Sequence, residues 1–172
     1  YRLRRSGDRN TINEWAGHLR HSYVFSPALR SYAFLQVQSD QALDLDLRLL
    51  LGGGLRRTVL ELGEGGVDVG LGAMLERERT ADGSETSDVR GANLLAARGR
   101  AGPVNLTATG FFQPLLDAWA DHRVALTGTL GVPLSQRLQV DVTFHWRRDT
   151  RPPPGIVVDD AGMKVGFTFS TR

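Results

Sequence analysis

Residues 138–148, LQVDVTFHWRR, alternate apolar and polar side chains without interruption as far as Trp146. One side carries Leu138, Val140, Val142, Phe144 and Trp146, and the other carries Gln139, Asp141, Thr143, His145 and Arg147. Successive side chains of a strand point to opposite faces, so the pattern predicts a strand with one apolar and one polar surface. A tilted strand needs roughly 9–11 residues to cross the hydrocarbon layer of a bilayer, and this one is long enough.

The same alternation recurs along most of the chain. It predicts strands at residues 14–25, 29–38, 47–56, 67–78, 89–98, 104–113, 122–132, 138–148 and 161–170, after an incomplete first strand at residues 1–5. The stretch 89–98 is the weakest, because Asn93 interrupts its apolar face. We therefore expect an all-β fold of about ten strands without a helix, arranged as an antiparallel up-and-down transmembrane β-barrel.

Composition sets further limits. A chain of 172 residues predicts one domain, spanning residues 1–172. It contains no Cys, so disulfides and thiolate metal sites are excluded, and no run of about 20 apolar residues predicts a spanning helix. The net charge of +2 is spread along the chain, with Lys164 as the only lysine, so no basic stripe indicates nucleic-acid binding. The chain begins at Tyr1 without an initiator Met or a signal peptide, so we expect a processed or truncated form.

Connection lengths separate a membrane barrel from a soluble sandwich, which can show the same alternation. After a polar turn at residues 5–11, the predicted connections alternate in length. The short ones are residues 26–28, 61–66, 99–103 and 133–137, and the longer ones are residues 39–46, 79–87, 114–121 and 149–160. Short periplasmic turns and longer outer loops give a barrel this rhythm, so we expect the two kinds of connection at opposite rims.

Aromatic and charged residues fit the same architecture. Aromatic residues gather near predicted strand ends: Trp15, Tyr23, Phe25, Phe112, Trp119, Trp146, Phe167 and Phe169. Such rings favour the lipid–water boundary. The polar faces carry charges at mid-strand: Arg20, Arg48, Asp68, Glu76, Arg98, Arg123, Asp141, Arg147 and Lys164. In a barrel these groups must face the lumen, since an Arg or Lys in the lipid costs about 2–4 kcal/mol at the midplane.

Three stretches carry a family resemblance. Residues 151–155, RPPPG, precede Asp159-Asp160 and the last strand GMKVGFTFS, residues 47–56 read LRLLLGGGLR, and residues 23–34 form a strand, a tight turn and an aromatic strand. The chain resembles the YdiY-like family of salt-induced outer-membrane proteins, whose members have no established biochemical activity. The resemblance implies a barrel in the outer membrane of a Gram-negative bacterium, lacking its N-terminal strands with their Ser-Gly-Asn-Thr turn. Residues 160–167 resemble the signal read by the barrel-assembly machinery, although the chain continues to Ser170-Thr171-Arg172.

Five groups were weighed as sites, and none is assigned as catalytic, cofactor-binding or metal-binding. His145 shares a face with Asp141 but has no recognisable strand Ser, which favours a lumen histidine over a hydrolase centre. His18 and His21 point to opposite faces and cannot share a metal. Strands follow the glycines at residues 52–54 and 63–72, which favours close packing over phosphate binding. Asp159-Asp160 could bind calcium, and Arg147-Arg148 could meet lipopolysaccharide phosphates at the rim.

The preferred interpretation is an integral outer-membrane barrel of unknown activity that is not an enzyme, with a structural, stress-related or narrow-channel role. We expect its lumen to be braced by ion pairs, because barrels near ten strands leave little open bore. Its expected partners are outer-membrane lipid, lipopolysaccharide and the barrel-assembly machinery, with no nucleic acid and no cofactor. Two alternatives stay open: a soluble lipocalin-like barrel with Val140, Val142 and Phe144 in its core, and an outer-membrane lipid-modifying enzyme centred on His145.

Overall fold

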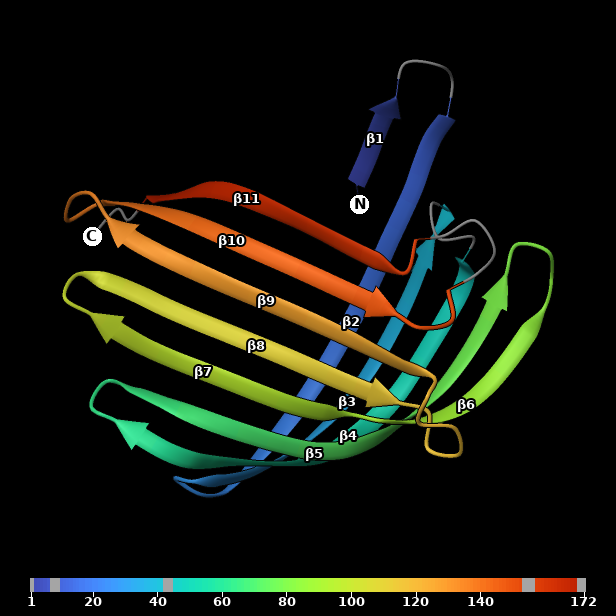
Figure 1. Cartoon of the computed structure of the whole chain (residues 1–172), viewed down its shortest axis with the longest axis horizontal. Helices are drawn as coiled ribbons and strands as arrows, with labels where there is room; N and C mark the ends of the chain where they lie inside the picture. The colour runs from blue at the N-terminus through green and yellow to red at the C-terminus, as the bar shows by residue number, and fades with distance from the viewer. Residues whose placement is uncertain (1, 7–9, 42–44, 153–156, 170–172) are drawn as a thin grey trace.

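A computed structural model of the chain contains eleven strands and describes residues 2–6, 10–41, 45–152 and 157–169 (Figure 1). The strands are β1 (Arg2–Ser6), β2 (Asn10–Ser26), β3 (Leu29–Asp40), β4 (Leu45–Leu62), β5 (Gly65–Thr80), β6 (Glu85–Gly91), β7 (Asn93–Ala101), β8 (Val104–Pro114), β9 (His122–Pro133), β10 (Leu138–Asp149) and β11 (Asp159–Phe169). No α-helix occurs within the described ranges. The all-β prediction is confirmed, and each predicted strand lies within or beside an observed one.

All strands belong to one antiparallel sheet with an up-and-down topology. The order is β1-β2-β3-β4-β5-β7-β8-β9-β10-β11, and β6 pairs with β5 beside this path. The strand predicted at residues 138–148 is β10, which pairs along its length with β9 on one side and β11 on the other. Val142 is opposite Leu130 on β9 and Val165 on β11. Among the described residues no ladder joins β11 to β1 or β2, so the observed architecture is a curled antiparallel sheet.

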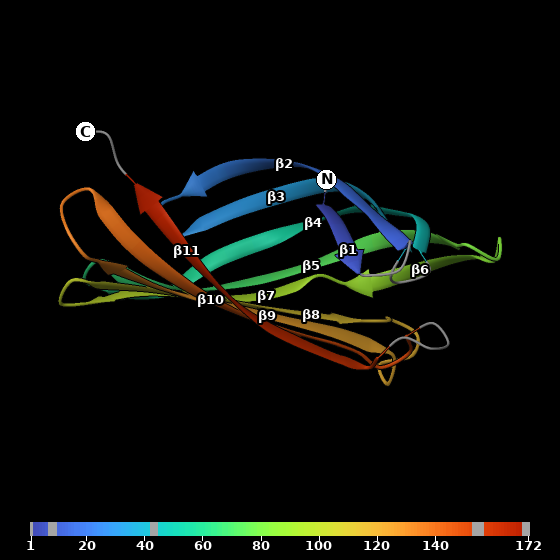
Figure 2. The same cartoon turned by 90° about the horizontal axis from the view of Figure 1, so that it is seen from above.

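The weak strand predicted at residues 89–98 is in fact two strands. Its ladder breaks at Ala92, beside Asn93, so β6 pairs with the end of β5 and β7 pairs with the start of β5. The prediction of a long polar loop at residues 79–87 was wrong, because β5 continues to Thr80 and β6 begins at Glu85. Cross-strand pairs such as Arg77 with Ser87 extend the sheet there, and the resulting β5–β6 hairpin projects beyond its neighbours (Figures 1 and 2).

The connections fall into two groups at opposite ends of the strands. One end, the short rim, carries residues 27–28, 63–64, 102–103 and 134–137, and the other end, the long rim, carries residues 41–44, 81–84, 115–121 and 150–158. Gly63 and Gly102 have positive φ angles of 55° and 58°, which the tight hairpins of the short rim require. The predicted grouping of connections is therefore observed. Parts of the predicted turns at 5–11 and 39–46, and of the proline–glycine loop, lie outside the described residues.

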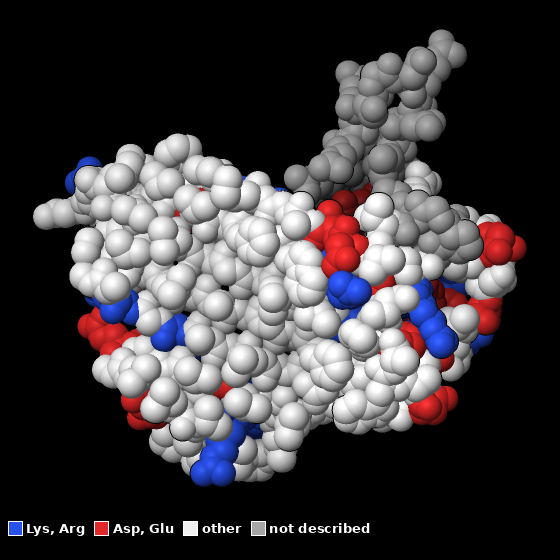
Figure 3. Space-filling view, viewed as in Figure 1, with Lys and Arg blue, Asp and Glu red and all other residues white. Residues whose placement is uncertain are grey.

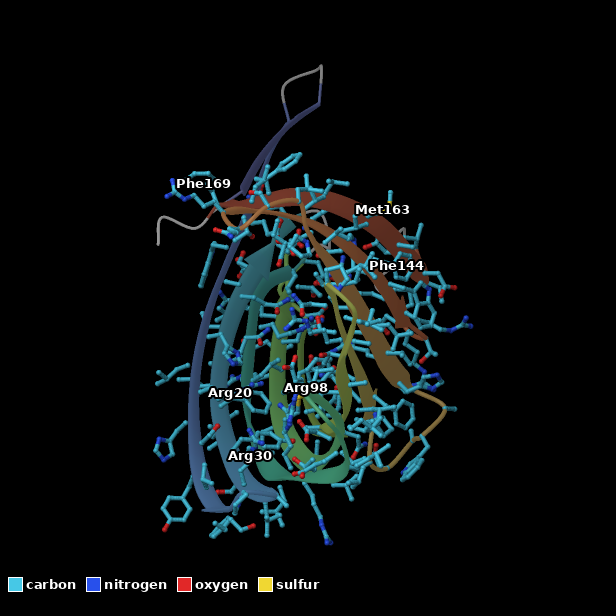
Figure 4. All side chains as sticks on the ribbon, turned by 90° about the vertical axis from the view of Figure 1, so that its left-hand side faces the viewer. Arg20, Arg30, Arg98, Phe144, Met163 and Phe169 are labelled. Atoms are coloured by element: carbon cyan, nitrogen blue, oxygen red, sulfur yellow. The ribbon has the colours of Figure 1, made fainter. Side chains whose placement is uncertain are left out.

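The sheet is curled, so it has a concave and a convex face (Figures 2 and 4). Arg20, Arg30 and Arg98 point into the space that the sheet surrounds, whereas Phe144, Met163 and Phe169 point away from it (Figure 4). The exposed fractions follow this division. Asp68 and Glu76 on the concave face are 1% and 3% exposed, while Leu71 and Leu75 between and beside them on β5 are 66% and 55% exposed.

The convex face is largely uncharged. Over β7 to β11 it forms a broad uncharged band, with charged side chains gathered toward its two ends (Figure 3). The eight predicted aromatic residues lie at the edges of such a band. Tyr23, Phe25, Phe167 and Phe169 lie toward the short rim, and Trp15, Phe112, Trp119 and Trp146 lie toward the long rim. All of them except Trp146 are exposed.

No helix in the part of the chain that the structure describes is long and apolar enough to cross a membrane.

Candidate functional site

Glu76 is the centre of a buried charge network on the concave face of β5. Its side chain is 1% exposed and forms ion pairs with three arginines of three other strands. Arg48 Nε lies 3.0 Å from Oε1, Arg90 Nε lies 2.7 Å from Oε2, and Arg123 Nη1 also donates to Oε1. A buried carboxylate is stable only when its lone pairs are satisfied, and here three guanidinium groups satisfy them.

The network continues toward the long rim through the same arginines. Arg48 Nη2 donates to Glu78 Oε2 over 2.7 Å, and Arg123 Nε donates to Asp149 Oδ2 over 2.7 Å. Arg90 Nη1 lies 3.0 Å from Asp121 Oδ1, in the connection between β8 and β9. One set of contacts therefore joins β4, β5, β6, β9 and β10 with that connection, which gives the curled sheet internal bracing.

A second buried cluster lies nearer the short rim, around Asp68 on β5. Arg56 Nη2 on β4 lies 2.5 Å from Asp68 Oδ2, and Arg98 Nη1 on β7 lies 3.2 Å from the same oxygen. Thr58 donates its hydroxyl to Asp68 Oδ1 over 2.6 Å. Both carboxylate oxygens are therefore occupied by hydrogen bonds from the neighbouring strands.

Glycines and aromatic rings fill the space between the two clusters. Gly52 and Gly54 on β4 face Met74 and Gly72 on β5. A Cβ on Gly52 would lie 2.6 Å from Phe34 Cζ, and a Cβ on Gly72 would lie 2.8 Å from the Tyr32 hydroxyl oxygen. The glycines thus leave room for the two rings against the sheet, and Tyr32 donates to the carbonyl of Ala92 over 3.0 Å. Close packing, as predicted for residues 52–54, explains these glycines.

The concave face surrounds a cavity of about 1260 Å³. Its lining includes Arg20, Arg30, Tyr32 and Arg56 toward the short rim, and Arg48, Glu76, Glu78 and Arg123 toward the long rim. Charged and polar side chains line the cavity on β2, β3, β4 and β5, as predicted, and apolar side chains such as Phe34, Leu50 and Met74 lie among them. Acidic and basic groups alternate across the long-rim half, as the predicted internal ion pairs require.

His145 and His18 both line the concave cavity. His145 lines the cavity and lies against Gly162, where an added Cβ would be 2.7 Å from its Nε2. Its face-mate Asp141 accepts instead from Gln139 over 2.6 Å and from Thr168 over 2.7 Å. His18 lines the cavity with its Nδ1 3.2 Å from Gln36 Oε1. Within the described ranges, no hydrogen bond links His145 to a Ser or a carboxylate.

The two charged pairs at the long rim bind each other. Arg147 Nη2 lies 2.9 Å from Asp160 Oδ2, and Arg148 Nη1 lies 3.4 Å from Asp159 Oδ2. All four side chains are 45–58% exposed. Among the residues that the structure describes, no group of three or more His, Cys, Asp or Glu could hold a metal ion. The acidic pair therefore forms ion pairs across the β10–β11 ladder.

Arg90 and Asp121 belong to the network but are not among the charges that the sequence predicted to face the lumen. Arg90 lies in the predicted strand 89–98, and its alternation with Val89 could have placed it on the polar face. Asp121 lies at the end of a connection, where no periodicity applies, and it reaches Arg90 through the fold of residues 115–121. The chain separation of 31 residues between them left no local signal.

The fold and this network define a class of protein: a single curled antiparallel sheet with a charged, ion-paired concave face and an apolar convex face. Residues 1–170 match the family described as "Protein of unknown function, DUF481", so the chain belongs to that family. No curated protein and no solved structure matches the chain.

Proposed function

We propose that this protein is an integral outer-membrane β-barrel of a Gram-negative bacterium and, within its family, belongs to the YdiY-like salt-induced type. The observation that carries the proposal is the inverted distribution of polarity over the sheet. Asp68, Glu76 and Arg90 are 1–3% exposed, whereas Leu19, Leu71 and Phe167 are 66–72% exposed. A soluble protein buries its large apolar side chains and leaves its charges in water.

Burial energies favour lipid as the solvent of the convex face. Each large apolar side chain that leaves water contributes about 1.5–3 kcal/mol. Every strand from β2 to β11 carries at least one exposed large apolar side chain. Examples are Leu19, Leu35, Leu51, Leu71 and Leu95. Immersion in hydrocarbon removes the cost of exposing all of them at once.

Strand length and the positions of the aromatic residues support the same environment. β4 has 18 residues and β5 has 16, more than the roughly 9–11 that a tilted spanning strand needs. The two sets of aromatic residues at the short and long rims correspond to the girdles of membrane barrels. Short connections at one rim and longer ones at the other match the periplasmic and outer sides of such a barrel.

The concave network favours a braced interior over a wide pore. Arg48, Glu76 and Arg123 link β4, β5 and β9 across the enclosed space, so the role we propose is structural and stress-related, with at most narrow conduction. Proposed partners are outer-membrane lipid, lipopolysaccharide at the rim and the barrel-assembly machinery. We propose no enzymatic activity and no nucleic-acid partner.

A soluble lipocalin-like barrel would need Val140, Val142 and Phe144 in its core. Phe144 is 50% exposed on the convex face, and the concave cavity mixes apolar side chains such as Leu50 and Met74 with charged ones such as Glu76 and Arg123, which disfavours a purely apolar ligand. The lipid-modifying alternative would need a nucleophile beside His145. The variant His145→Ala should leave the lipid composition of the membrane unchanged. A changed composition would favour the lipid-modifying enzyme instead.

Spin labels test the membrane proposal directly, because the chain has no Cys and single labels are unique. Leu19→Cys and Val165→Cys place labels on the convex face, and Ser22→Cys and Lys164→Cys are matched controls on the concave face of the same strands. In reconstituted vesicles the first pair should be relaxed by lipid-dissolved oxygen and shielded from a water-soluble nickel chelate. Full accessibility of the first pair to the chelate would overturn the proposal.

Conduction is tested separately in planar bilayers. Currents across a range of salts and voltages would support a narrow channel. Silence under all these conditions would leave the structural role and remove the channel.

A further inference from the structure

The short-rim half of the cavity has more arginines than its carboxylates can neutralise. Arg20, Arg30, Arg56 and Arg98 all lie on the concave face there, and Asp68 forms ion pairs with two of them, Arg56 and Arg98. Figure 4 shows Arg20, Arg30 and Arg98 pointing into the enclosed space. The long-rim half is different, because Glu76, Glu78, Asp121 and Asp149 each pair with an arginine.

Asp68 has no remaining capacity for further arginines. Its Oδ1 accepts from Thr58, and its Oδ2 accepts from Arg56 Nε and Nη2 and from Arg98 Nη1. Within the described ranges, Arg20 and Arg30 have no ion pair with any carboxylate. Most of their guanidinium N–H groups are therefore available to a ligand in the cavity.

The register brings these like charges together. Arg30 on β3 is directly opposite Arg56 on β4, and both residues line the cavity, so two arginines start from one cross-strand pair on the concave face. Like charges at such positions destabilise a sheet unless a counter-charge lies between them. Arg20 and Arg56 also lie close enough to Tyr32 to act on its hydroxyl electrostatically, so these two arginines share one region of the cavity.

The other charged groups of this half do not change the balance. Asp141 on β10 accepts from Gln139 and Thr168 and keeps its negative charge, which the positive charge of Lys164 in the cavity lining on β11 offsets. Arg100, at the short rim, is paired with Glu64 at 3.2 Å. An excess of positive charge therefore remains inside, in a partly enclosed space where screening by salt is weaker than at an open surface.

We propose that this half of the lumen is a binding site for a soluble phosphate-type oxyanion, held by Arg20, Arg30 and Arg56. Guanidinium groups bind such anions through paired N–H donors with matching geometry. Rings of Arg and Lys also select anions in pores. The inference rests on the proposed function only in placing the site inside a membrane barrel.

Phosphate binding to the purified chain tests the site. In dodecyl maltoside micelles at fixed pH and ionic strength, titration with inorganic phosphate against chloride should give saturable binding. The double variant Arg20→Gln/Arg30→Gln should weaken phosphate binding at least tenfold, because it removes two of the three arginines proposed to hold the anion. Neither side chain forms an ion pair with Asp68, so the buried cluster around Asp68 should stay intact. The matched variant Arg57→Gln/Arg137→Gln removes two charges near the same rim, outside the cavity lining, and should bind as the parent does.

Three results would overturn the site: no saturable binding by the parent, equal losses in the two double variants, or competition by phosphatidylglycerol added to the micelles. The last result would assign the arginines to a lipid headgroup. A measurement on the parent keeps the test independent of variant folding: phosphate should slow modification of Arg20 and Arg30 by phenylglyoxal and leave Arg57 and Arg137 unchanged. The spin labels on the convex face test the membrane proposal separately from this site. If those labels report lipid while the chain binds no phosphate, the phosphate site is wrong and the membrane proposal stands.

Discussion

Arg90 Nε donates to Glu76 Oε2 over 2.7 Å, and the two side chains are only 4% and 1% exposed. The pair joins β6 to β5 inside the curled sheet, and Arg48 and Arg123 approach the same carboxylate from β4 and β9. Glu76 therefore constrains the arrangement of three other strands, because the guanidinium group of an arginine from each strand must reach its carboxylate. Four consequences of the structure can be measured.

Replacing Glu76 by Gln should destabilise the protein strongly. The change keeps the size of the side chain but leaves the charges of Arg48, Arg90 and Arg123 without their common partner, and breaking a buried ion pair costs about 3–5 kcal/mol. Urea unfolding followed by tryptophan fluorescence in vesicles measures the loss. Glu85→Gln is the control, since Glu85 and its partner Arg77 are 47% and 67% exposed and an exposed ion pair contributes little to stability. Equal effects of the two variants would refute the bracing role of Glu76.

Replacing Gly52 by Ala should disturb the packing between the charge clusters. The added methyl group would lie 2.6 Å from Phe34 Cζ and 2.7 Å from Met74 Cβ, and overpacking of this kind costs about 1–3 kcal/mol. Gly166→Ala on β11 is the control, because nothing lies within 4 Å of a Cβ there. The same unfolding measurement should show a loss for the first variant only. An unchanged Gly52→Ala protein would mean that the aromatic packing over β4 is not as described.

Arginine on the convex face should report depth in the membrane. Leu51, in the middle of β4, and Leu62, at its short-rim end, are 55% and 63% exposed. In a bilayer Leu51→Arg should cost about 2–4 kcal/mol, and Leu62→Arg about 0–1 kcal/mol, because the cost falls toward the interface. Unfolding free energies in phospholipid vesicles give the comparison. In water both sites are equally solvated, so equal small costs would argue against a membrane location.

The tip of the β5–β6 hairpin should loosen in acid. Thr80 donates its hydroxyl to Asp82 Oδ1 over 2.6 Å, and the backbone N–H of Ser84 donates to the same oxygen over 2.9 Å. The hydrogen bond from Thr80 is the main cause that lowers the pKa of Asp82 below its ordinary value of 3.8. Because the folded pKa is the lower one, this stabilisation is fully present above the unfolded pKa and is lost as the pH falls through the folded pKa.

Hydrogen exchange at the amides of residues 81–84, followed while the pH is lowered below about 4, measures this loosening. Exchange must be corrected for its intrinsic dependence on pH. The matched variant Asp82→Asn has no titrating group at this position, so its tip should show no such transition. A transition of equal size in both proteins would assign it to another group.

Much of the site could be predicted from local sequence. The period-two alternation placed Asp68 and Glu76 on one face of their strand and Leu71 and Leu75 on the other, because neighbouring side chains of a strand point in opposite directions. The predicted short and longer connections do lie at opposite rims, although the connection at residues 81–84 is no longer than the one at residues 134–137. The same alternation failed at residues 79–87, where polar residues form paired strands in a projecting hairpin, since hydrophobicity gives no signal for strands that both faces expose to water.

The sequence by itself thus determined an all-β chain with one charged and one apolar face, because side-chain alternation is a property of neighbouring residues. Only the tertiary structure decided which charges meet. Glu76 and Arg123 are 47 residues apart, and Arg30 faces Arg56 through the register of β3 and β4. Register and sheet curvature arise from pairing between distant strands, so the partners on the concave face follow from the assembled sheet.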